Sequence, residues 1–479
     1  MFFGHRKKRI KLGDYGRLRL NSYKVGESQR NTHTYVAGIT GKGKSKFLES
    51  VFVQDVLCGH GCGVLDPHSD LIDDILRNLL SREKHFSNHL DRIIYFDPSR
   101  DDYVVPFNVL DSEFGPAETT ENVIEAFRRA WPKALDEAPR FADVATNAIL
   151  ALYKSGLSLI EMERLLSDRE FREQVLSQID DVVVKSFFHN RYDRWGRDAP
   201  MMVESLLNKV SAFTSSPHLR VILGAKTNAL RFKDIMDRGQ VLLLDLGRCD
   251  AKTRRLVGSL VATGFERASR TRRDSRKPYH LYMDEFQIFC SNDGAATTFS
   301  QILSECRKYG LLLTLAHQTQ AQLSERIRGA ISNIQLKVIF GVGRDDAEIH
   351  TKDLFQVNPQ RVKHQVKDVN QQQRSHPMFY SLPEQWEETI QRIQNLPSRA
   401  ALIKAKGRGV TQITTSPVKY KDGVDIDELK QKLAKRSGVP KQSLEEIFLS
   451  RYQDSSNEFK HNEPVKLPSS KQLENTFWE

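Results

Sequence analysis

The sequence lacks any run of roughly 20 uncharged apolar residues, the length that a membrane-spanning helix needs. Its first nine residues, Met1–Arg9, carry positive charges with no apolar core behind them, so they do not form a signal peptide. Cysteine is scarce, and the five cysteines are odd in number, which favours reduced thiols over a disulfide framework. We therefore expect a cytoplasmic protein with no transmembrane segment in this chain.

The closest approach to a metal motif is Cys58-Gly-His60-Gly-Cys62. A zinc site needs the usual Cys-x₂₋₄-Cys pair with further ligands elsewhere, and the sequence contains no second pair of this kind. We interpret the stretch as small residues between the end of a helix and the next strand.

Positive charge is in excess: 72 Lys and Arg residues stand against 61 Asp and Glu, a net charge of +11. This balance fits an anionic polymer or an acidic membrane surface as partner. Basic residues cluster at Arg6–Lys11, at Arg267–Lys277 and in the last hundred residues. Each single run is also typical of a solvated loop, so the runs indicate affinity for phosphate without identifying the partner.

A phosphate-binding loop is the most informative motif in the chain. Gly38, Gly43, Lys44 and Ser45 fit the pattern G-x-x-x-x-G-K-[ST]. Glycines let successive backbone N–H groups face phosphate oxygens, the lysine adds a point charge, and the serine hydroxyl ligates Mg²⁺. The nucleotide-binding residues that we predict are Gly38, Ile39, Thr40, Gly41, Lys42, Gly43, Lys44 and Ser45, with ATP and Mg²⁺ as cofactors.

The context of the loop supports this interpretation. Thr34–Ala37 is a short β-prone run before the loop, and apolar residues recur after it at helical spacing up to Leu57. The alternative, a glycine-rich turn that binds nothing, does not need this strand–loop–helix order. We conclude that the sequence contains a nucleotide site.

Strands and helices alternate along much of the chain, which predicts an α/β fold with a mostly parallel sheet covered on both faces. Between residues 116 and 237 all apolar patterns have helical spacing, which predicts an all-α insertion. We therefore expect a discontinuous nucleotide-binding domain at 34–115 and 238–415. A basic N-terminal leader at 1–33 precedes it, and a polar, partly disordered tail at 416–479 follows it. Within this tail we expect one helix at Asp427–Lys435 and another around Ser443–Arg451, and disorder at Asp454–Glu479.

A P-loop ATPase also needs an acidic residue that holds Mg²⁺, and this residue lies at the end of a neighbouring strand. Two strands compete: Val241–Asp245, and His280–Met283 followed by Asp284 and Glu285. We favour the second, because Asp284 can ligate the metal shell while Glu285 accepts a proton from the attacking water. Asp66, at the end of another predicted strand, is expected near the nucleotide.

Two further polar residues are candidates for catalysis. Gln318 follows an apolar strand, where its amide could contact both the γ-phosphate and the lytic water; otherwise it simply begins a loop. Arg307 ends a predicted helix, where it is either a cation favoured at a helix C-terminus or an arginine finger. The residues alone do not separate these alternatives.

Taken together, the motifs resemble the FtsK/HerA superfamily of ring ATPases with a RecA-like P-loop domain, and within it the coupling proteins of conjugative type IV secretion systems. The matching stretches are Gly38–Ser45, Val64–Leu71, Val105–Asn108, Met283–Phe286, Arg307–Gly310 and Ala316–Thr319. The resemblance covers roughly residues 34–420, including the helical insertion.

The resemblance implies that Lys44 and Ser45 bind ATP and Mg²⁺, that Asp284 and Glu285 are the metal-shell ligand and the catalytic carboxylate, and that Gln318 senses phosphate. It places Arg307 where the family has a finger acting on the neighbouring subunit's ATP, with Arg344 as a weaker second candidate. It also implies a homo-oligomer, a hexameric ring with DNA in its channel, and relaxase or secretion-channel proteins as further partners.

The sequence departs from these coupling proteins in two respects. They usually begin with transmembrane helices, whereas here the phosphate loop arrives within the first fifty residues, so we expect membrane association only peripherally at the inner membrane, through partners. Lys42 replaces the small residue common between the two glycines.

Two alternative functions stay open: a HerA-like translocase that works with a nuclease, and a nucleotide-gated adaptor that delivers protein substrates to a secretion pore.

Overall fold

The computed structural model describes residues 9–16, 19–82, 87–130, 139–272, 277–290, 293–367, 375–418, 420–421, 423 and 425–453. The expected disorder of the C-terminal end falls on residues 454–479, outside these ranges. Parts of the basic clusters at Arg6–Lys11 and Arg267–Lys277 also lie outside them. Among the described helices, none combines the length and the apolar character that crossing a membrane requires.

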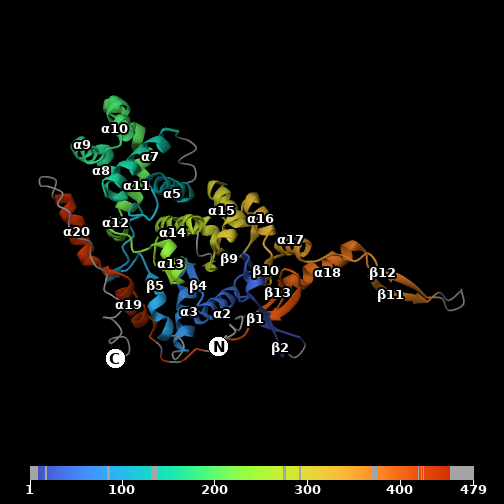
Figure 1. Cartoon of the computed structure of the whole chain (residues 1–479). Helices are drawn as coiled ribbons and strands as arrows, with labels where there is room; N and C mark the ends of the chain where they lie inside the picture. The colour runs from blue at the N-terminus through green and yellow to red at the C-terminus, as the bar shows by residue number, and fades with distance from the viewer. Residues whose placement is uncertain are drawn as a thin grey trace, which may run out of the picture.

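A single large sheet organises the described residues (Figure 1). Its eleven strands are, in spatial order, β2 (Asn21–Val25), β1 (Ile10–Tyr15), β14 (Thr411–Thr414), β13 (Ala400–Lys404), β10 (Leu336–Ile339), β3 (Thr34–Ala37), β9 (Leu311–His317), β8 (Tyr279–Met283), β4 (Gly61–Asp66), β7 (Val241–Asp245) and β5 (Ile93–Phe96). The strands from β10 to β5 pair in parallel, and those from β13 to β2 add an antiparallel extension.

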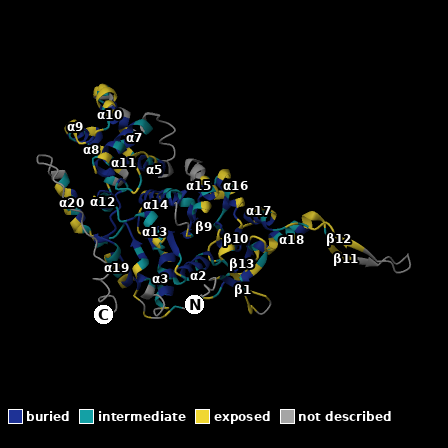
Figure 2. Cartoon of the chain, in the orientation of Figure 1, coloured by how far each residue is buried: buried dark blue, intermediate teal, exposed yellow. Residues whose placement is uncertain are grey.

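Continuous apolar strands form the parallel part because both of its faces are covered, as Figure 2 shows. In β7, Leu242 and Leu244 join one core cluster, whereas Val241 and Leu243 join the other. The fold class predicted from the sequence, a mostly parallel α/β sheet with many helices, is therefore confirmed.

Helices cover the two faces separately. One face carries α2 (Lys44–Leu57), α3 (Asp70–Leu80) and α19 (Ile426–Ser437). The other carries α13 (Phe232–Arg238), α14 (Ala251–Thr271), α15 (Asp293–Glu305), α16 (Glu325–Ser332), α17 (Arg344–Leu354) and α18 (Leu382–Gln394). A short helix, α1 (Glu27–Arg30), precedes β3.

In the described residues between β6 (Tyr103–Val104) and β7, helices are joined by turns and loops, and the only β-structure is one isolated bridge between Phe107 and Asn228. Its longer helices before α13 are α5 (Pro116–Ala130), α7 (Pro139–Lys154), α8 (Met162–Ser167), α9 (Arg169–Ser177), α10 (Val182–Phe187), α11 (Ala199–Thr214) and α12 (Pro217–Leu223). They form the upper lobe in Figure 1, and their core is continuous with that of the sheet. The limits of the insertion as a domain stay a prediction.

The residues expected to form a polar tail after 415 include an ordered layer of the fold. Helix α19 packs against β5 and buries Ile426, Leu429 and Leu433. After it, β15 (Val439–Pro440) pairs with β6, and α20 (Lys441–Gln453) contacts α12. The two helices expected here, at Asp427–Lys435 and around Ser443–Arg451, are therefore present as α19 and α20. A helix with many charged residues can still bury one apolar stripe, and that stripe attaches this part to the rest of the fold.

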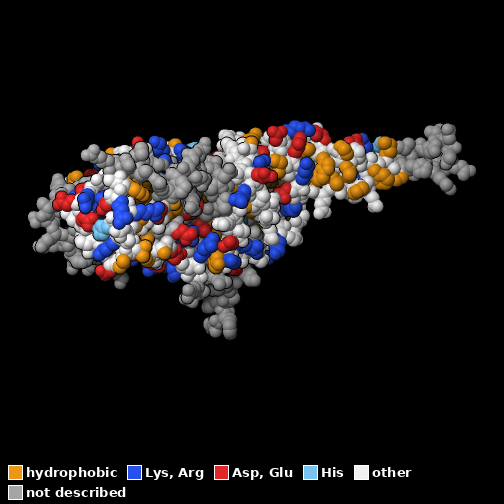
Figure 3. Space-filling view, turned by 90° about the horizontal axis from the view of Figure 1, so that it is seen from above, with side chains coloured by type: hydrophobic (Ala, Val, Ile, Leu, Met, Phe, Trp, Pro, Cys, Tyr) orange, Lys and Arg blue, Asp and Glu red, His pale blue; other side chains and the backbone are white. Residues whose placement is uncertain are grey.

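An unforeseen feature projects from the sheet on the side of β10. It consists of α17, the hairpin β11 (Val362–Lys367) and β12 (Ser375–Phe379), and α18; we call these four elements the arm. Hydrophobic side chains gather along it in Figure 3, and the exposed ones include Val362, Met378, Phe379 and Leu382. The arm is continuous with the sheet, since β13 follows α18 directly.

Candidate functional site

Four neighbouring strands bring the predicted site residues to one edge of the sheet. β3, β9, β8 and β4 are parallel neighbours, with Ala37 opposite His317 and Met283 opposite both Leu315 and Leu65. The phosphate loop, Gln318, the Asp284–Glu285 pair and Asp66 follow or end these four strands. Strand β9 lies between β3, which leads into the phosphate loop, and β8, which leads into Glu285. Gln318, which follows β9, therefore lies between the phosphate loop and Glu285.

The phosphate loop has the backbone that an anion cradle requires. Gly41 and Gly43 have positive φ angles of 78° and 108°, which side chains rarely adopt. A Cβ on Gly38 would lie 2.7 Å from the Cβ of Phe340, so this position also needs glycine. Gly43 is the N-cap of α2, and no side chain in the described structure accepts from the first N–H groups there. These N–H groups and the helix dipole suit a phosphate.

Lys44 lies inside this loop. Its Nζ donates to the carbonyl oxygen of Gly38 at 2.7 Å. Burial lowers the pKa of Lys44, and the nearby charges of Glu285 and Asp284 act in the opposite direction. A buried ammonium that is bonded to one carbonyl oxygen and lies near two carboxylates is suited to receive the oxygens of a polyphosphate.

Three carboxyl groups meet beside the loop. Burial, followed by the charges of Asp66 and Glu285, raises the pKa of Asp284 to about 7, and burial raises that of Asp66 to about 6. The hydroxyl of Ser45 donates to Asp284 at 3.5 Å. A divalent cation would relieve this repulsion, and hydroxyl and carboxylate oxygens are ligands that Mg²⁺ prefers. The donor set therefore fits Mg²⁺, and the roles of Ser45 and Asp284 as its ligands stay a prediction.

Glu285 is held by two amides. Gln318 donates to its Oε1 at 2.8 Å, and Gln287 donates to its Oε2 at 2.6 Å. The hydroxyl of Thr40 donates to the side-chain carbonyl of Gln318 at 3.1 Å. A hydrogen-bonded chain thus runs from the phosphate loop through Gln318 to Glu285, whose own backbone is left-handed, with φ of 44°.

The sequence did not point to two residues of this edge. Gln287 orients Glu285 from the short helical turn Phe286–Phe289, and only the geometry of that turn reveals it. Arg399 lies beside the phosphate loop: its N–H donates to the carbonyl of Lys42 at 2.9 Å, and its Cα would be 3.3 Å from a Cβ on Gly43. Arg399 is more than 350 residues away in sequence, so no local pattern could place it there.

Asp245, the rejected alternative to Asp284, ends β7, which β4 separates from β8. Its carboxylate accepts from Tyr95 at 2.9 Å and from Lys430 at 3.0 Å, and it also accepts from Ser69. These partners hold Asp245 in a structural network that includes α19.

The two arginine candidates lie at different edges of the sheet. Arg307 is exposed in the turn Cys306–Tyr309, which precedes β9, whereas Gln318 follows it. The seven residues of β9 separate these two ends by roughly 20 Å. Arg344 is exposed at the start of α17, where it donates to both carboxylate oxygens of Glu387 at 3.0 and 2.8 Å. The chain's own phosphate loop is therefore out of reach of Arg307.

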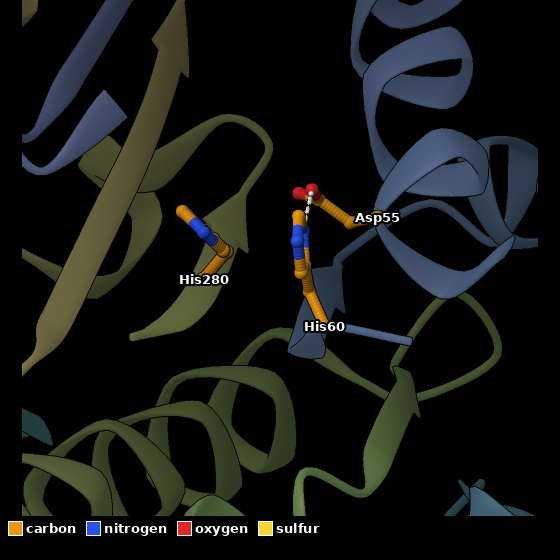
Figure 4. Close-up of side chains that lie close together, drawn as sticks. All are labelled: Asp55, His60 and His280. Carbon is orange, nitrogen blue, oxygen red and sulfur yellow. Dashed lines mark hydrogen bonds and ion pairs between the residues drawn. The ribbon is translucent and has the colours of Figure 1, made fainter. Parts of the chain in front are cut away.

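A cluster of Asp55, His60 and His280 has the composition of a metal site (Figure 4). However, Arg30 donates to both oxygens of Asp55, at 2.5 and 2.7 Å, and Tyr282 donates to one of them at 2.5 Å. The pKa of Asp55 is lowered, because the charge of Arg30 outweighs the effect of burial. We interpret the cluster as a buried structural ion pair, and the predicted absence of zinc at Cys58 and Cys62 stays a prediction.

The chain shares its fold with solved structures of a conjugative coupling protein and of VirB4. The bacterial conjugative coupling protein TrwB, in an unbound form, has a TM-score of 0.59 at 15% identity, covering 88% of this chain and 98% of that one. TrwB in complex with ADP and Mg²⁺ gives 0.58 at 16% with the same coverage. VirB4 of Thermoanaerobacter pseudethanolicus gives 0.54 at 13%, again covering 88% and 98%. No protein-family model and no curated protein sequence matches the chain.

Proposed function

We propose that the protein is an ATP-hydrolysing DNA translocase that assembles as a hexameric ring and acts as a coupling ATPase in conjugation or type IV secretion. The observation that carries this proposal is the convergence of the phosphate loop, Asp284, Glu285 and Gln318 on one edge of the sheet. The fold shared with TrwB and VirB4 and the net charge of +11 support it.

In this proposal the residues divide the work. The N–H groups of the phosphate loop and Lys44 bind the phosphates of ATP. Ser45 and Asp284 would hold Mg²⁺, which would supply positive charge to the phosphates. Glu285 accepts a proton from the attacking water, while Gln287 and Gln318 fix the direction of its carboxylate. Through Thr40, Gln318 links that carboxylate to the phosphate loop.

Arg307 completes the site from a neighbouring copy. An exposed arginine on the opposite edge of the sheet can act only on another subunit's nucleotide, as a head-to-tail ring arranges it. Its guanidinium would then stabilise the charge that develops on the γ-phosphate. Recruitment by partners at the inner membrane, such as a relaxase or secretion-channel proteins, belongs to the same proposal.

The test is ATP hydrolysis with and without DNA. We expect DNA to stimulate hydrolysis and Lys44→Ala to abolish it, because the substitution removes the cation buried in the phosphate loop. Lys252→Ala, which changes a lysine in the first turn of α14, serves as the control and should leave the rate unchanged.

Hydrolysis that DNA does not change would contradict translocation and favour an adaptor for protein substrates. Stimulation that requires a nuclease partner would favour the HerA-like alternative. Absence of hydrolysis in the unaltered protein, with ATP, Mg²⁺ and DNA all present, would contradict the proposed enzyme.

A further inference from the structure

Lys42 is the unusual residue of the phosphate loop, and its side chain is bound to protein. Its Nζ donates to the carbonyl oxygen of Leu396 at 2.9 Å. Leu396 lies two residues beyond the end of α18, and its amide still bonds back to Ile393. The ammonium therefore lies at the carbonyl end of a helix, where the dipole favours a cation.

The surroundings leave room for this side chain. A Cβ on Gly341 would lie 3.0 Å from the Cε of Lys42 and 3.2 Å from its Cδ, so a side chain at 341 would crowd the lysine stem. The carbonyl of Gly341 also accepts from the N–H of Ile39 at 3.0 Å. Lys42 and Gly341 thus form a matched pair that joins the phosphate loop to the end of β10.

The backbone of Lys42 is bound to the same segment. Its carbonyl accepts from the N–H of Arg399 at 2.9 Å. Arg399 is itself fixed in a left-handed conformation, with φ of 68°: its Nη2 donates to the carbonyl of Thr415 at 2.5 Å, and its own carbonyl accepts from the N–H of Thr415 at 2.8 Å. Residues 396–399 are therefore bonded both to the loop and to the residue that follows β14.

We propose that Lys42 is a positioning residue that couples nucleotide occupancy of the phosphate loop to the carboxyl end of α18, and through α18 to the arm. The proposal rests on the proposed nucleotide binding. Two hydrogen bonds join residue 42 to residues 396–399, so a shift of the loop around phosphate changes how α18 is held. The same bonds pre-organise the loop, which makes binding tighter.

The rival role for Lys42 is that of a second phosphate cation. A ligand of the γ-phosphate would stabilise ATP far more than ADP, whereas a positioning residue stabilises both nucleotides alike. Lys42→Met separates the roles because it keeps the stem and removes the donor. We expect this substitution to weaken ATP and ADP binding by the same factor, about 3- to 10-fold, the size of a single hydrogen bond.

The decisive readout is amide hydrogen exchange of the full chain with and without ADP and Mg²⁺. In the unaltered protein we expect nucleotide to protect residues 38–45 and, at the same time, residues 395–399. In Lys42→Met, at saturating nucleotide, we expect the protection of residues 38–45 to remain and that of residues 395–399 to be reduced, because only the backbone bond from Arg399 to residue 42 is left. Lys42→Arg, which keeps a donor, recovers at least part of the protection of residues 395–399.

A second variant reaches the same contact from its other side. Gly341→Val blocks the path of the Lys42 side chain, so it should mimic Lys42→Met and add nothing to it in the double variant. Protection of residues 395–399 that is undiminished in Lys42→Met would overturn the coupling, and so would a loss of ATP affinity much larger than that of ADP. If nucleotide protects no part of residues 38–45 in the unaltered protein, the proposed nucleotide binding is contradicted, and so is the coupling that depends on it.

Discussion

At the scale of single residues, the backbone of Glu285 connects geometry with the proposed chemistry. Its φ of 44° is rare for a residue with a side chain, and such conformations persist only where the surroundings fix them. Here the surroundings are the two amides of Gln287 and Gln318, which bind both carboxylate oxygens. A carboxylate bound in this way has a defined direction before any water arrives.

The first prediction concerns this carboxylate. Glu285→Gln should leave the Kd for ATP within about twofold of the original, because the phosphate loop is unchanged, and should lower kcat by about 10²- to 10⁴-fold, the usual contribution of a general base. Equilibrium binding and steady-state hydrolysis measure the two quantities separately. Gln287→Ala should lower kcat less than Glu285→Gln does, since it removes only one of the two amides. An unchanged kcat in Glu285→Gln would exclude Glu285 as the base.

Buried histidines are a second residue-scale feature. Burial lowers the pKa of His280, His317 and His350 to about 3 and that of His33 to about 4. In the unfolded chain a histidine has a pKa of about 6.5, so as the pH falls the unfolded chain binds the proton at a higher pH than the folded protein does. Between these two pKa values the unfolded state holds more protons, so the free energy of unfolding falls as the pH is lowered.

We use His350 to test this effect, because its ring is buried beside Tyr35 and is away from the carboxylates of the site. From pH 7.5 to pH 5, the unaltered protein should lose about 2 kcal/mol more of its free energy of unfolding than His350→Met does. Denaturant unfolding at both pH values gives the difference. His364→Met, at an exposed position on β11, serves as the control. An equal loss in the unaltered protein and in His350→Met would show that His350 is protonated in the fold.

At the scale of elements, the sequence predicted what is encoded locally. The strand before the phosphate loop, the helix after it and the strand before Asp284 each have a continuous pattern, so their positions could be read from the residues. The position of Gln318 between the loop and Glu285 could not, because it depends on β9 pairing between β3 and β8. Arg399 was missed for the same reason, since long-range pairing brings it to Gly43.

Helix α19 was expected as a helix, but its packing on the sheet was not. Its composition is charged, and one of those charges, Lys430, is buried and holds the helix in place. Lys430 forms ion pairs with Asp73 at 2.5 Å and with Asp245 at 3.0 Å. Burial alone would raise the pKa of Asp245, but the charge of Lys430 outweighs it and the pKa is lowered. A buried lysine with two carboxylates from other elements cannot be recognised from composition.

The element-scale prediction is that this ion pair holds α19 on the sheet. Lys430→Met leaves Asp245 buried without its cation, so it should lower the free energy of unfolding by about 3–5 kcal/mol. The double variant Lys430→Met, Asp245→Asn should recover part of that loss, because the uncompensated charge is gone. Lys432→Met, on the exposed side of α19, is the matched control. Denaturant unfolding of the four proteins measures the effect, and equal losses in Lys430→Met and Lys432→Met would contradict it.

At the scale of the whole molecule, the two edges of the parallel strands have different roles. The edge at the carboxyl ends holds the phosphate loop, Asp284, Glu285 and Gln318, and the opposite edge holds Arg307. One copy therefore cannot close the site that we propose, but two copies in head-to-tail contact can. The arm and the helical lobe extend from the sheet on different sides, so a neighbouring copy has several surfaces to contact (Figure 1).

The most direct test of this account mixes two inactive variants, Glu285→Gln and Arg307→Ala, with DNA, ATP and Mg²⁺ present. An Arg307→Ala subunit keeps its own Glu285, and a Glu285→Gln neighbour keeps its Arg307, so the site between these two subunits contains both intact residues. In an equal mixture about a quarter of the head-to-tail contacts have this arrangement. We therefore predict that the mixture hydrolyses ATP well above the sum of the two separate rates. A rate equal to that sum at every mixing ratio, or full hydrolysis by a single isolated copy, would contradict the shared site.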